Sequence, residues 1–289
     1  MERECLEAKL GVRAARADAA TFLTGVSPVS ARGVGLEYVD FRDFEEGDDA
    51  RFIDWRLSAR SLDASGSYRL VVKVFRAERR VRAVLVADLS TSMLFGRKAR
   101  TLAYSASVIS AAAYELEDEL ALVLGAGGRV LAYPWARPDR VPHLVSKAAC
   151  GQQAKGALSL PELARAASRL ASPYILLTDY ANKLEELNAA IAALRGRGLG
   201  IVLIYEPAEL KPPTSCLATL KDPETGAGVG GRLEDLYSAV QSHVRDVRAL
   251  LKWRRVPYVE VAWPWVRERR AALANLYLRV RRGLPATAP

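Results

Sequence analysis

Short hydrophobic runs alternate with longer amphipathic segments through most of the chain. The runs are rich in Val, Ile and Leu, and they predict buried strands at 81–87, 120–125, 173–179, 199–207 and 257–262. The intervening segments predict helices at 98–117, 138–149, 159–170, 183–196, 232–252 and 265–281. Because apolar strands that alternate with helices build parallel βα units, the pattern predicts an α/β fold with a mostly parallel central sheet flanked by helices.

The rest of the chain is less regular. "GAGGRVLAYP" (125–134) predicts a turn and a further strand, and 211–231 predicts a loop or hairpin. Near the N-terminus we expect a helix at 3–20 and a turn-rich loop at 24–35. A charged and aromatic stretch without a clean period follows at 36–62, and a strand is expected at 67–75. We therefore expect an N-terminal segment (1–80) that packs on a main domain (81–283), and a C-terminal tail (284–289).

Composition narrows the class of protein. The length of 289 residues suits one large α/β domain with a smaller appendage. The uncharged stretch 101–114 is too short to cross a bilayer, and the charged N-terminus lacks the pattern of a secretory signal, so we expect a cytoplasmic protein with no membrane span. Three widely spaced cysteines argue against a disulfide framework or a zinc ribbon, and two histidines make a histidine-based site improbable.

A net charge of +9 favours anionic partners. The positive residues gather in "FRAERRVR" (75–82), "LKWRR" (251–255) and "RERRAALANLYLRVRR" (267–282). They predict either solvated, arginine-rich helix faces or a surface that binds nucleic acid or another anion. No nucleic-acid motif with interleaved aromatic residues is present.

The strand at 81–87 ends in chemistry-bearing residues. "DLSTS" presents Asp88, Ser90 and Ser92 after the strand, and the strand at 173–179 ends in Asp179. Ligands of parallel sheets bind at the carboxyl ends of strands, and carboxylate and hydroxyl oxygens suit Mg²⁺ or Mn²⁺. The alternative is that Ser90 and Ser92 only cap the following helix while Asp88 accepts backbone amides.

These residues resemble known families. "DLSTS" resembles the Asp-x-Ser-x-Ser of the von Willebrand factor type A domain, whose metal-ion-dependent adhesion site binds Mg²⁺. The segment 32–60 resembles the signature of the family called domain of unknown function 58. "YEPAEL" (205–210) and "LKDPETG" (220–226) resemble further features of that family, and the likeness covers roughly 30–262. The signature residues matched are Gly35, Glu37, Tyr38, Arg42, Gly47, Asp48, Asp49, Arg51, Ile53, Asp54, Trp55, Ser58, Ala59 and Arg60.

The resemblance implies a Rossmann-like von Willebrand type A domain that acts as a metal-dependent protein-interaction module and not as an enzyme. Its implied partner is a MoxR-type AAA+ ATPase, or a client of that ATPase, in complex assembly or remodelling. Asp88, Ser90, Ser92 and Asp179 are the implied metal ligands, directly or through water, and an acidic side chain of the partner would complete the coordination.

One position departs from the family pattern. The adhesion site usually has a threonine between the first motif and the last aspartate, whereas "KGALSLPE" (155–162) has Leu158 or Ser159 there. Ser159 could be a fifth ligand. It could equally be only the N-cap of the next helix, because Ser159, Pro161 and Glu162 form a capping pattern.

The signature segment has two interpretations. Asp48, Asp49, Arg51, Asp54 and Arg60 could form a buried ion-pair network that fixes the segment against the sheet. Trp55 would then be its apolar anchor. Alternatively, the segment is a surface that engages the ATPase or its client.

An enzyme remains the weaker alternative. A Mg²⁺-dependent phosphatase of the haloacid dehalogenase type needs a second acid two residues after Asp88, where the chain has Ser90, and Asp179 with Lys183 matches its later groups only loosely. The chain has no Gly-x-Ser-x-Gly and no Walker A motif, and the "GAGG" turn is not followed by a helix.

Overall fold

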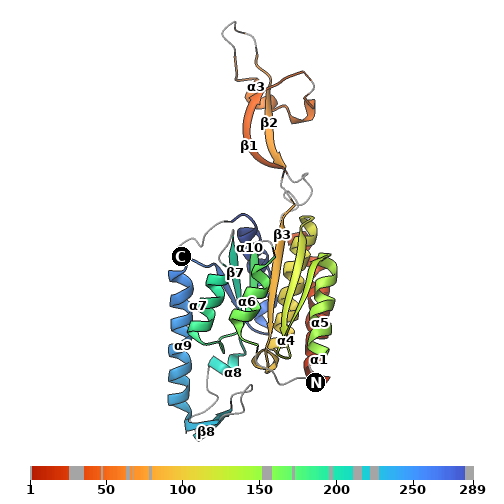
Figure 1. Ribbon diagram of the computed structural model, residues 1–289. Helices are drawn as coiled ribbons and strands as arrows, with labels where there is room; N and C mark the ends of the chain where they lie inside the picture. The colour runs from red at the N-terminus through yellow and green to blue at the C-terminus, as the bar shows by residue number, and fades with distance from the viewer. Residues whose placement is uncertain are drawn as a thin grey trace. The chain divides into compact units, whose positions relative to one another are not determined.

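A six-stranded sheet forms the centre of the larger of two units in the computed structural model (Figure 1). The structure describes residues 2–25, 36–46, 48–62, 66, 68–77, 80–151, 158–170, 173–194, 198–210, 217–221 and 228–283. The strands are β3 (Arg82–Leu89), β4 (Glu119–Ala126), β5 (Arg129–Ala136), β6 (Tyr174–Thr178), β7 (Leu199–Ile204) and β10 (Tyr258–Val261). Their order is β10-β7-β6-β3-β4-β5, and every pairing is parallel except that of β4 with β5. This confirms the predicted α/β architecture.

Helices cover both faces of the sheet because its central strands are apolar on both sides. Leu85 and Ala87 of β3 face a core shared with α1 (Glu2–Gly25), α4 (Lys98–Glu115), α5 (Val141–Gly151) and α10 (Arg270–Arg281). Val84 and Val86 face a second core shared with α6 (Leu160–Ser168), α7 (Leu184–Ala193) and α9 (Leu233–Trp253). The side chains of β3 are therefore fixed in register from both sides.

Most predicted elements are confirmed with small shifts at their ends. The loop or hairpin expected at 211–231 contains the hairpin β8 (Leu217–Lys221) and β9 (Gly228–Arg232). The helices expected from 138 and from 265 each begin with a short 3-10 turn, η3 (Pro138–Arg140) and η4 (Trp265–Arg267). The short helix α8 (Pro207–Leu210) was not predicted. The predicted tail 284–289 and most of the predicted loop 24–35 lie outside the described residues.

The cysteine prediction needs a correction. Cys5 of α1 and Cys150 of α5 form a disulfide, although 145 positions separate them. The spacing argued against a framework of several bridges, but it could not show that α1 packs against α5 and brings one pair of thiols together. Such bridges are typical of oxidising compartments and of intracellular proteins from hyperthermophiles.

The smaller unit comprises Val26–Arg80. Its antiparallel pair, β1 (Leu36–Asp43) and β2 (Val71–Ala77), is joined by η1 (Ala50–Phe52) and α3 (Trp55–Ser58). The predicted segment 1–80 is therefore divided, because α1 belongs to the larger unit. Among the described residues, no helix is long and apolar enough to cross a membrane.

Candidate functional site

Two aspartates lie at the carboxyl ends of adjacent parallel strands. Asp88 is the second-to-last residue of β3, and Asp179 directly follows β6, its parallel neighbour. The chain leaves β3 through α4 on one face and returns to β6 through α6 on the other. This reversal of strand order is where open α/β sheets bind ligands. The structure thus brings together the two carboxylates that the sequence predicted to meet.

The "DLSTS" turn collects oxygen atoms around Asp88. One carboxylate oxygen of Asp88 accepts a hydrogen bond from the Ser90 amide at 2.8 Å, and the other accepts one from the Thr178 hydroxyl at 2.9 Å. The Oγ atoms of Ser90 and Ser92 lie 3.0 Å apart. Neither serine caps α4, which begins at Lys98 without a side-chain cap. Their hydroxyls therefore remain candidates for ligand binding.

The environment of Asp88 disfavours its charged form. Burial raises the pKa of Asp88, and the negative charge of Asp179 raises it further. Hydrogen bonds from Ser90 and Thr178 oppose the shift but do not cancel it. A carboxylate in this position would be stabilised by a nearby cation, and perturbed carboxylates of this kind gather at functional sites.

Lys98 is a member of the site that sequence reasoning missed. Its ammonium group donates to Asp179 Oδ2 at 2.8 Å and to Glu209 Oε1 at 2.6 Å, and its side chain is only 1% exposed. Burial alone would lower the pKa of Lys98, but the charges of Asp179 and Glu209 outweigh burial and raise it. The lysine that sequence reasoning set beside Asp179, Lys183, is exposed.

Ser159 has a structural role at the start of a helix. It is the N-cap of α6, where it forms a capping box with Glu162, and its hydroxyl lies 3.0 Å from the Glu162 carboxylate. The neighbouring Leu158 packs against the second core. Of the two interpretations of Ser159, the structure supports the helix cap, and its role as a fifth ligand stays a prediction.

The residues around Asp88 fit a small divalent cation in part. Asp88, Ser90 and Ser92 offer only oxygen donors, as Mg²⁺ and Mn²⁺ prefer. The Lys98 ammonium binds the carboxylates of Asp179 and Glu209, while the nearby carboxylate of Asp88 accepts from the Ser90 amide and the Thr178 hydroxyl, so these three acids and one lysine carry an excess of two negative charges when all are ionised. Within the described part of the chain, no three His, Cys, Asp or Glu side chains form a metal cluster, so the serine hydroxyls are essential to such a site.

The signature segment is stabilised by polar contacts at its surface. Arg42 binds Asp48 through two hydrogen bonds of 2.6 and 2.7 Å, and Asp49 binds Arg51. Asp54 caps α3 by accepting from the Leu57 amide. The predicted ion pairs are therefore present in part, but they join half-buried aspartates to exposed arginines and are not buried.

The role of Trp55 as an apolar anchor against the sheet stays a prediction. Trp55 is 65% exposed, and the buried side chains among the described residues of the small unit are Ile53, Val71, Val72 and Ser58. The Ser58 hydroxyl accepts from the Val71 amide at 2.8 Å. Arg60 is exposed. Gly47 and the side chain of Glu37 lie outside the described part.

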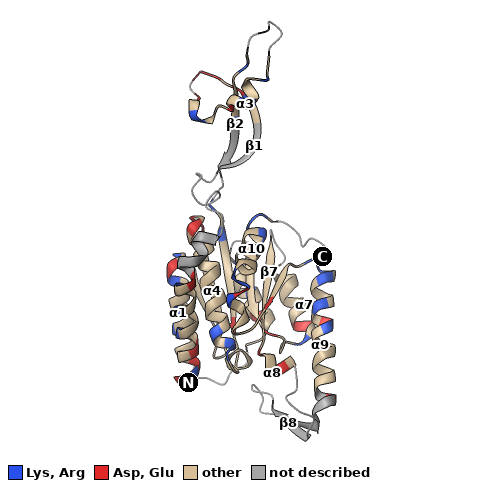
Figure 2. Ribbon diagram, turned by 180° about the vertical axis from the view of Figure 1, so that it is seen from behind, with Lys and Arg blue, Asp and Glu red and all other residues tan. Residues whose placement is uncertain are grey.

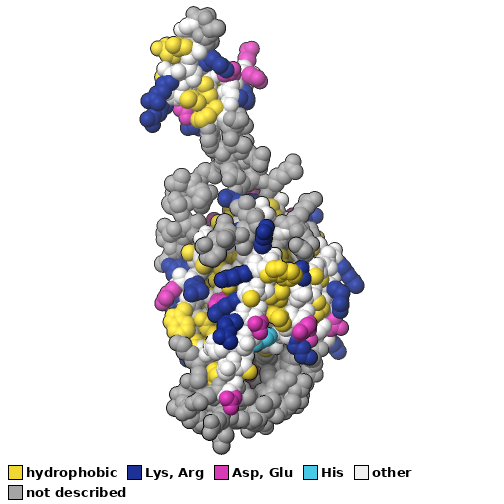
Figure 3. All heavy atoms as spheres, turned by 90° about the vertical axis from the view of Figure 1, so that its left-hand side faces the viewer, with side chains coloured by type: hydrophobic (Ala, Val, Ile, Leu, Met, Phe, Trp, Pro, Cys, Tyr) yellow, Lys and Arg dark blue, Asp and Glu magenta, His cyan; other side chains and the backbone are white. Residues whose placement is uncertain are grey.

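Several arginines of the predicted basic clusters bind polar side chains of the protein itself. Arg267 binds Asp18, Arg281 binds the buried Asp118, and Arg254 binds Asn188. Lys and Arg occur on several helices (Figure 2). On the face in Figure 3, they are interspersed with acidic and hydrophobic side chains. Part of each of these two C-terminal clusters therefore stabilises the fold through ion pairs and hydrogen bonds between its elements.

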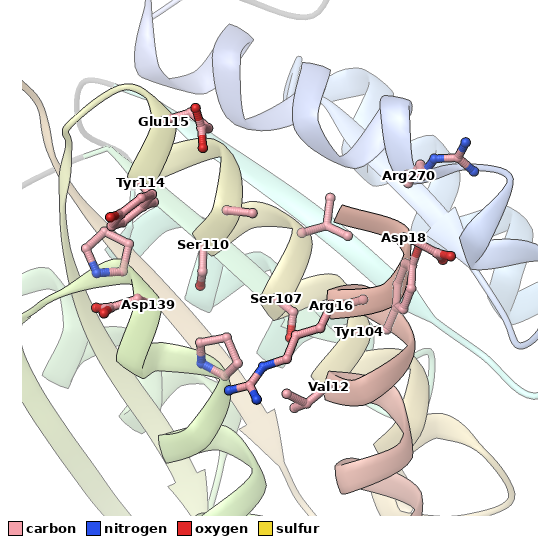
Figure 4. Close-up of a pocket in the computed structure, with 15 residues that line it drawn as sticks. Val12, Arg16, Asp18, Tyr104, Ser107, Ser110, Tyr114, Glu115, Asp139 and Arg270 are labelled. Carbon is pink, nitrogen blue, oxygen red and sulfur yellow. The ribbon is translucent and has the colours of Figure 1, made fainter. Parts of the chain in front are cut away.

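A cavity of about 300 Å³ is lined by residues other than Asp88 and Asp179 (Figure 4). α1, α4 and the start of α5 supply most of its walls, which are largely apolar. Ser110, which lines it, has a buried hydroxyl for which the described residues supply no hydrogen-bond partner. None of the predicted metal ligands lines this cavity.

The fold and the site define an α/β protein with a carboxylate and hydroxyl cluster at the strand-order reversal. Residues 40–236 match the family described as "Protein of unknown function DUF58", and the chain belongs to that family. No functionally curated protein matches the chain.

Three solved structures show distant likeness. An aerotolerance-related membrane protein from Bacteroides fragilis is 12% identical, with 69% of this chain and 99% of that chain covered and a TM-score of 0.43. The conserved hypothetical protein BatB from Bacteroides thetaiotaomicron is 16% identical, with coverages of 69% and 98% and a TM-score of 0.43. The pilus adhesin SpaC from Lactobacillus rhamnosus is 12% identical, with coverages of 71% and 31% and a TM-score of 0.41.

Proposed function

We propose that this chain is a non-enzymatic protein-interaction module with a von Willebrand type A-like domain, whose partner binds at the carboxyl end of the sheet. The observation that carries the proposal is the convergence of Asp88, Ser90 and Ser92 beside an excess of negative charge. Asp88, Ser90 and Ser92 would hold Mg²⁺ or Mn²⁺, and the bound ion would supply a positive charge for an acidic side chain of the partner.

The chain's own residues prepare this surface. The hydrogen bonds from Ser90 and Thr178 fix the orientation of the Asp88 carboxylate before anything binds. Asn182 donates to the Thr178 hydroxyl at 2.8 Å and so directs that hydroxyl toward Asp88. Phe95 is 54% exposed in the loop that follows the serines. Exposed aromatic residues beside fixed polar groups are typical of protein interfaces.

We further propose that the partner is a MoxR-type AAA+ ATPase or one of its clients, and that the two meet in the cytoplasm. Membership of the DUF58 family and the signature residues of the small unit support this choice of partner. A nucleic-acid partner has less support, because two arginines of the basic clusters, Arg267 and Arg281, are paired with aspartates of the protein itself.

A pull-down from native lysate tests the proposal. The tagged full chain is used in Mg²⁺ and in EDTA, together with Asp88→Ala and with Asp139→Ala as the matched control, since Asp139 pairs with the exposed Arg137 and lies outside the candidate site. We expect an ATPase or its client to be retained by wild type and the control in Mg²⁺, and to be lost with EDTA or Asp88→Ala. Equal retention in all four samples would contradict the proposal.

A further inference from the structure

Lys98 is buried at the junction of three elements that are far apart in sequence. It begins α4, Asp179 follows β6, and Glu209 lies in α8. The ammonium group is within hydrogen-bond distance of both carboxylates, and it also lies 5.9 Å from the centre of the Phe95 ring. An almost fully buried ammonium group is retained only where acidic partners compensate for its lost hydration.

The segment "YEPAEL" closes over the start of α4. The Glu206 carboxylate accepts from the Arg97 amide at 2.9 Å, and the Glu206 amide donates to Glu209 Oε2 at 2.9 Å. Gly96 has a φ of +60°, and a Cβ atom there would overlap the Glu206 carboxylate. The close approach of the two segments therefore requires glycine at this position. The same approach brings the Glu209 carboxylate to the Lys98 ammonium.

These contacts occupy Asp179 on both sides. Its Oδ2 atom accepts from Lys98, and its Oδ1 atom accepts from the Ala181 amide at 2.9 Å. Among the described residues, the donors to Asp88 are both neutral, namely the Ser90 amide and the Thr178 hydroxyl. The two carboxylates that the sequence predicted to act alike are therefore unlike, since one is neutralised inside the protein and the other is not.

We infer that Lys98 is a positioning residue which, with Glu209, holds Asp179 out of direct coordination and sets the charge that a divalent cation meets at Asp88, Ser90 and Ser92. This inference rests on the proposed function. Removing the lysine charge frees Asp179 and makes the site more negative, so a cation binds more tightly. Removing the Glu209 charge leaves the ammonium less compensated, so a cation binds more weakly.

The test is Mn²⁺ binding to the purified full chain, followed by loss of the free-ion electron paramagnetic resonance signal. Lys98→Met is compared with wild type and with Lys147→Met, which removes the same charge from an exposed position on α5. We expect Lys98→Met to bind Mn²⁺ at least tenfold more tightly than either. Glu209→Gln should bind at least threefold more weakly than wild type. Circular dichroism establishes that each variant is folded.

Unchanged Mn²⁺ affinity in folded Lys98→Met, or no binding by any variant, would overturn the inference and leave Lys98 a purely structural ion pair. Should Lys98→Met not fold, Glu209→Gln decides, because unchanged or tighter binding contradicts the charge argument. The proposed function fails separately, if the pull-down does not depend on Mg²⁺ or Asp88. Binding by Lys98→Met alone would support the inference while removing the cation from the proposed function.

Discussion

The disulfide between α1 and α5 should contribute strongly to the stability of the larger unit. Cys5→Ser removes the bridge that links positions 145 residues apart. Closing a loop of that length lowers the entropy of the unfolded chain by an amount equivalent to about 5 kcal/mol, and bridges commonly contribute about 2–4 kcal/mol. We expect Cys5→Ser to lower the free energy of unfolding by about 2–5 kcal/mol.

The assay is thermal unfolding followed by circular dichroism, with and without a reductant. For a protein of this size, a loss of that order lowers the Tm by roughly 5–15 °C. Reductant should lower the Tm of wild type to that of Cys5→Ser and should leave the variant unchanged. Cys216→Ser is the control that keeps the bridge. The reasoning is refuted if Cys5→Ser and wild type unfold within about 1 kcal/mol of each other, or if oxidised wild type has three free thiols.

Three further predictions concern packing and ion pairs. Gly11→Ala should destabilise the protein by about 1–3 kcal/mol, because a Cβ atom at this position would overlap the backbone of α4. Gly151→Ala is the control, since a Cβ atom there meets no atom within 4 Å, and urea unfolding of both variants measures the difference. Asp118→Ala should cost about 3–5 kcal/mol in the same assay, since it removes a buried carboxylate that pairs with Arg281 and accepts from the Tyr277 hydroxyl, and a loss under 1 kcal/mol would disprove this role. Glu260→Gln should be less stable than wild type at pH 7, with a difference that narrows as the pH falls below about 4.5. Burial works against the shift, but Arg248 holds the pKa of Glu260 below its ordinary value, so its stabilisation is present above that pH and is lost as the carboxylate protonates; a difference independent of pH would contradict this.

The fold could be predicted from the hydrophobic pattern because nearly every strand of the sheet is a short apolar run. β3 is buried from Ala83 to Leu89, and its residues face both helix layers. The capping pattern at Ser159 and Glu162 also identified the start of α6, since capping depends on neighbours in sequence. Patterns among neighbouring residues were therefore enough to predict most helices and strands, and to predict that the site lies at the carboxyl end of the sheet.

The composition of the site could be predicted only where topology dictated it. Asp88 and Asp179 each end a parallel strand, so the fold alone brings them to one edge. Lys98 and Glu209 are 111 residues apart and meet only because α8 folds back over the start of α4. The hydrophobic pattern cannot predict a contact between residues so far apart in sequence, and it could not predict the disulfide for the same reason.

The most direct test of the central claim is where a cation binds. Crystals of the full chain soaked in Mn²⁺ would be measured at a wavelength where manganese scatters anomalously. We predict one strong peak within coordination distance of Ser90 Oγ and Ser92 Oγ, on the side of Asp88, while the Lys98 ammonium stays between Asp179 and Glu209. The absence of a peak there at millimolar Mn²⁺, or a peak that displaces Lys98, would contradict the proposed site.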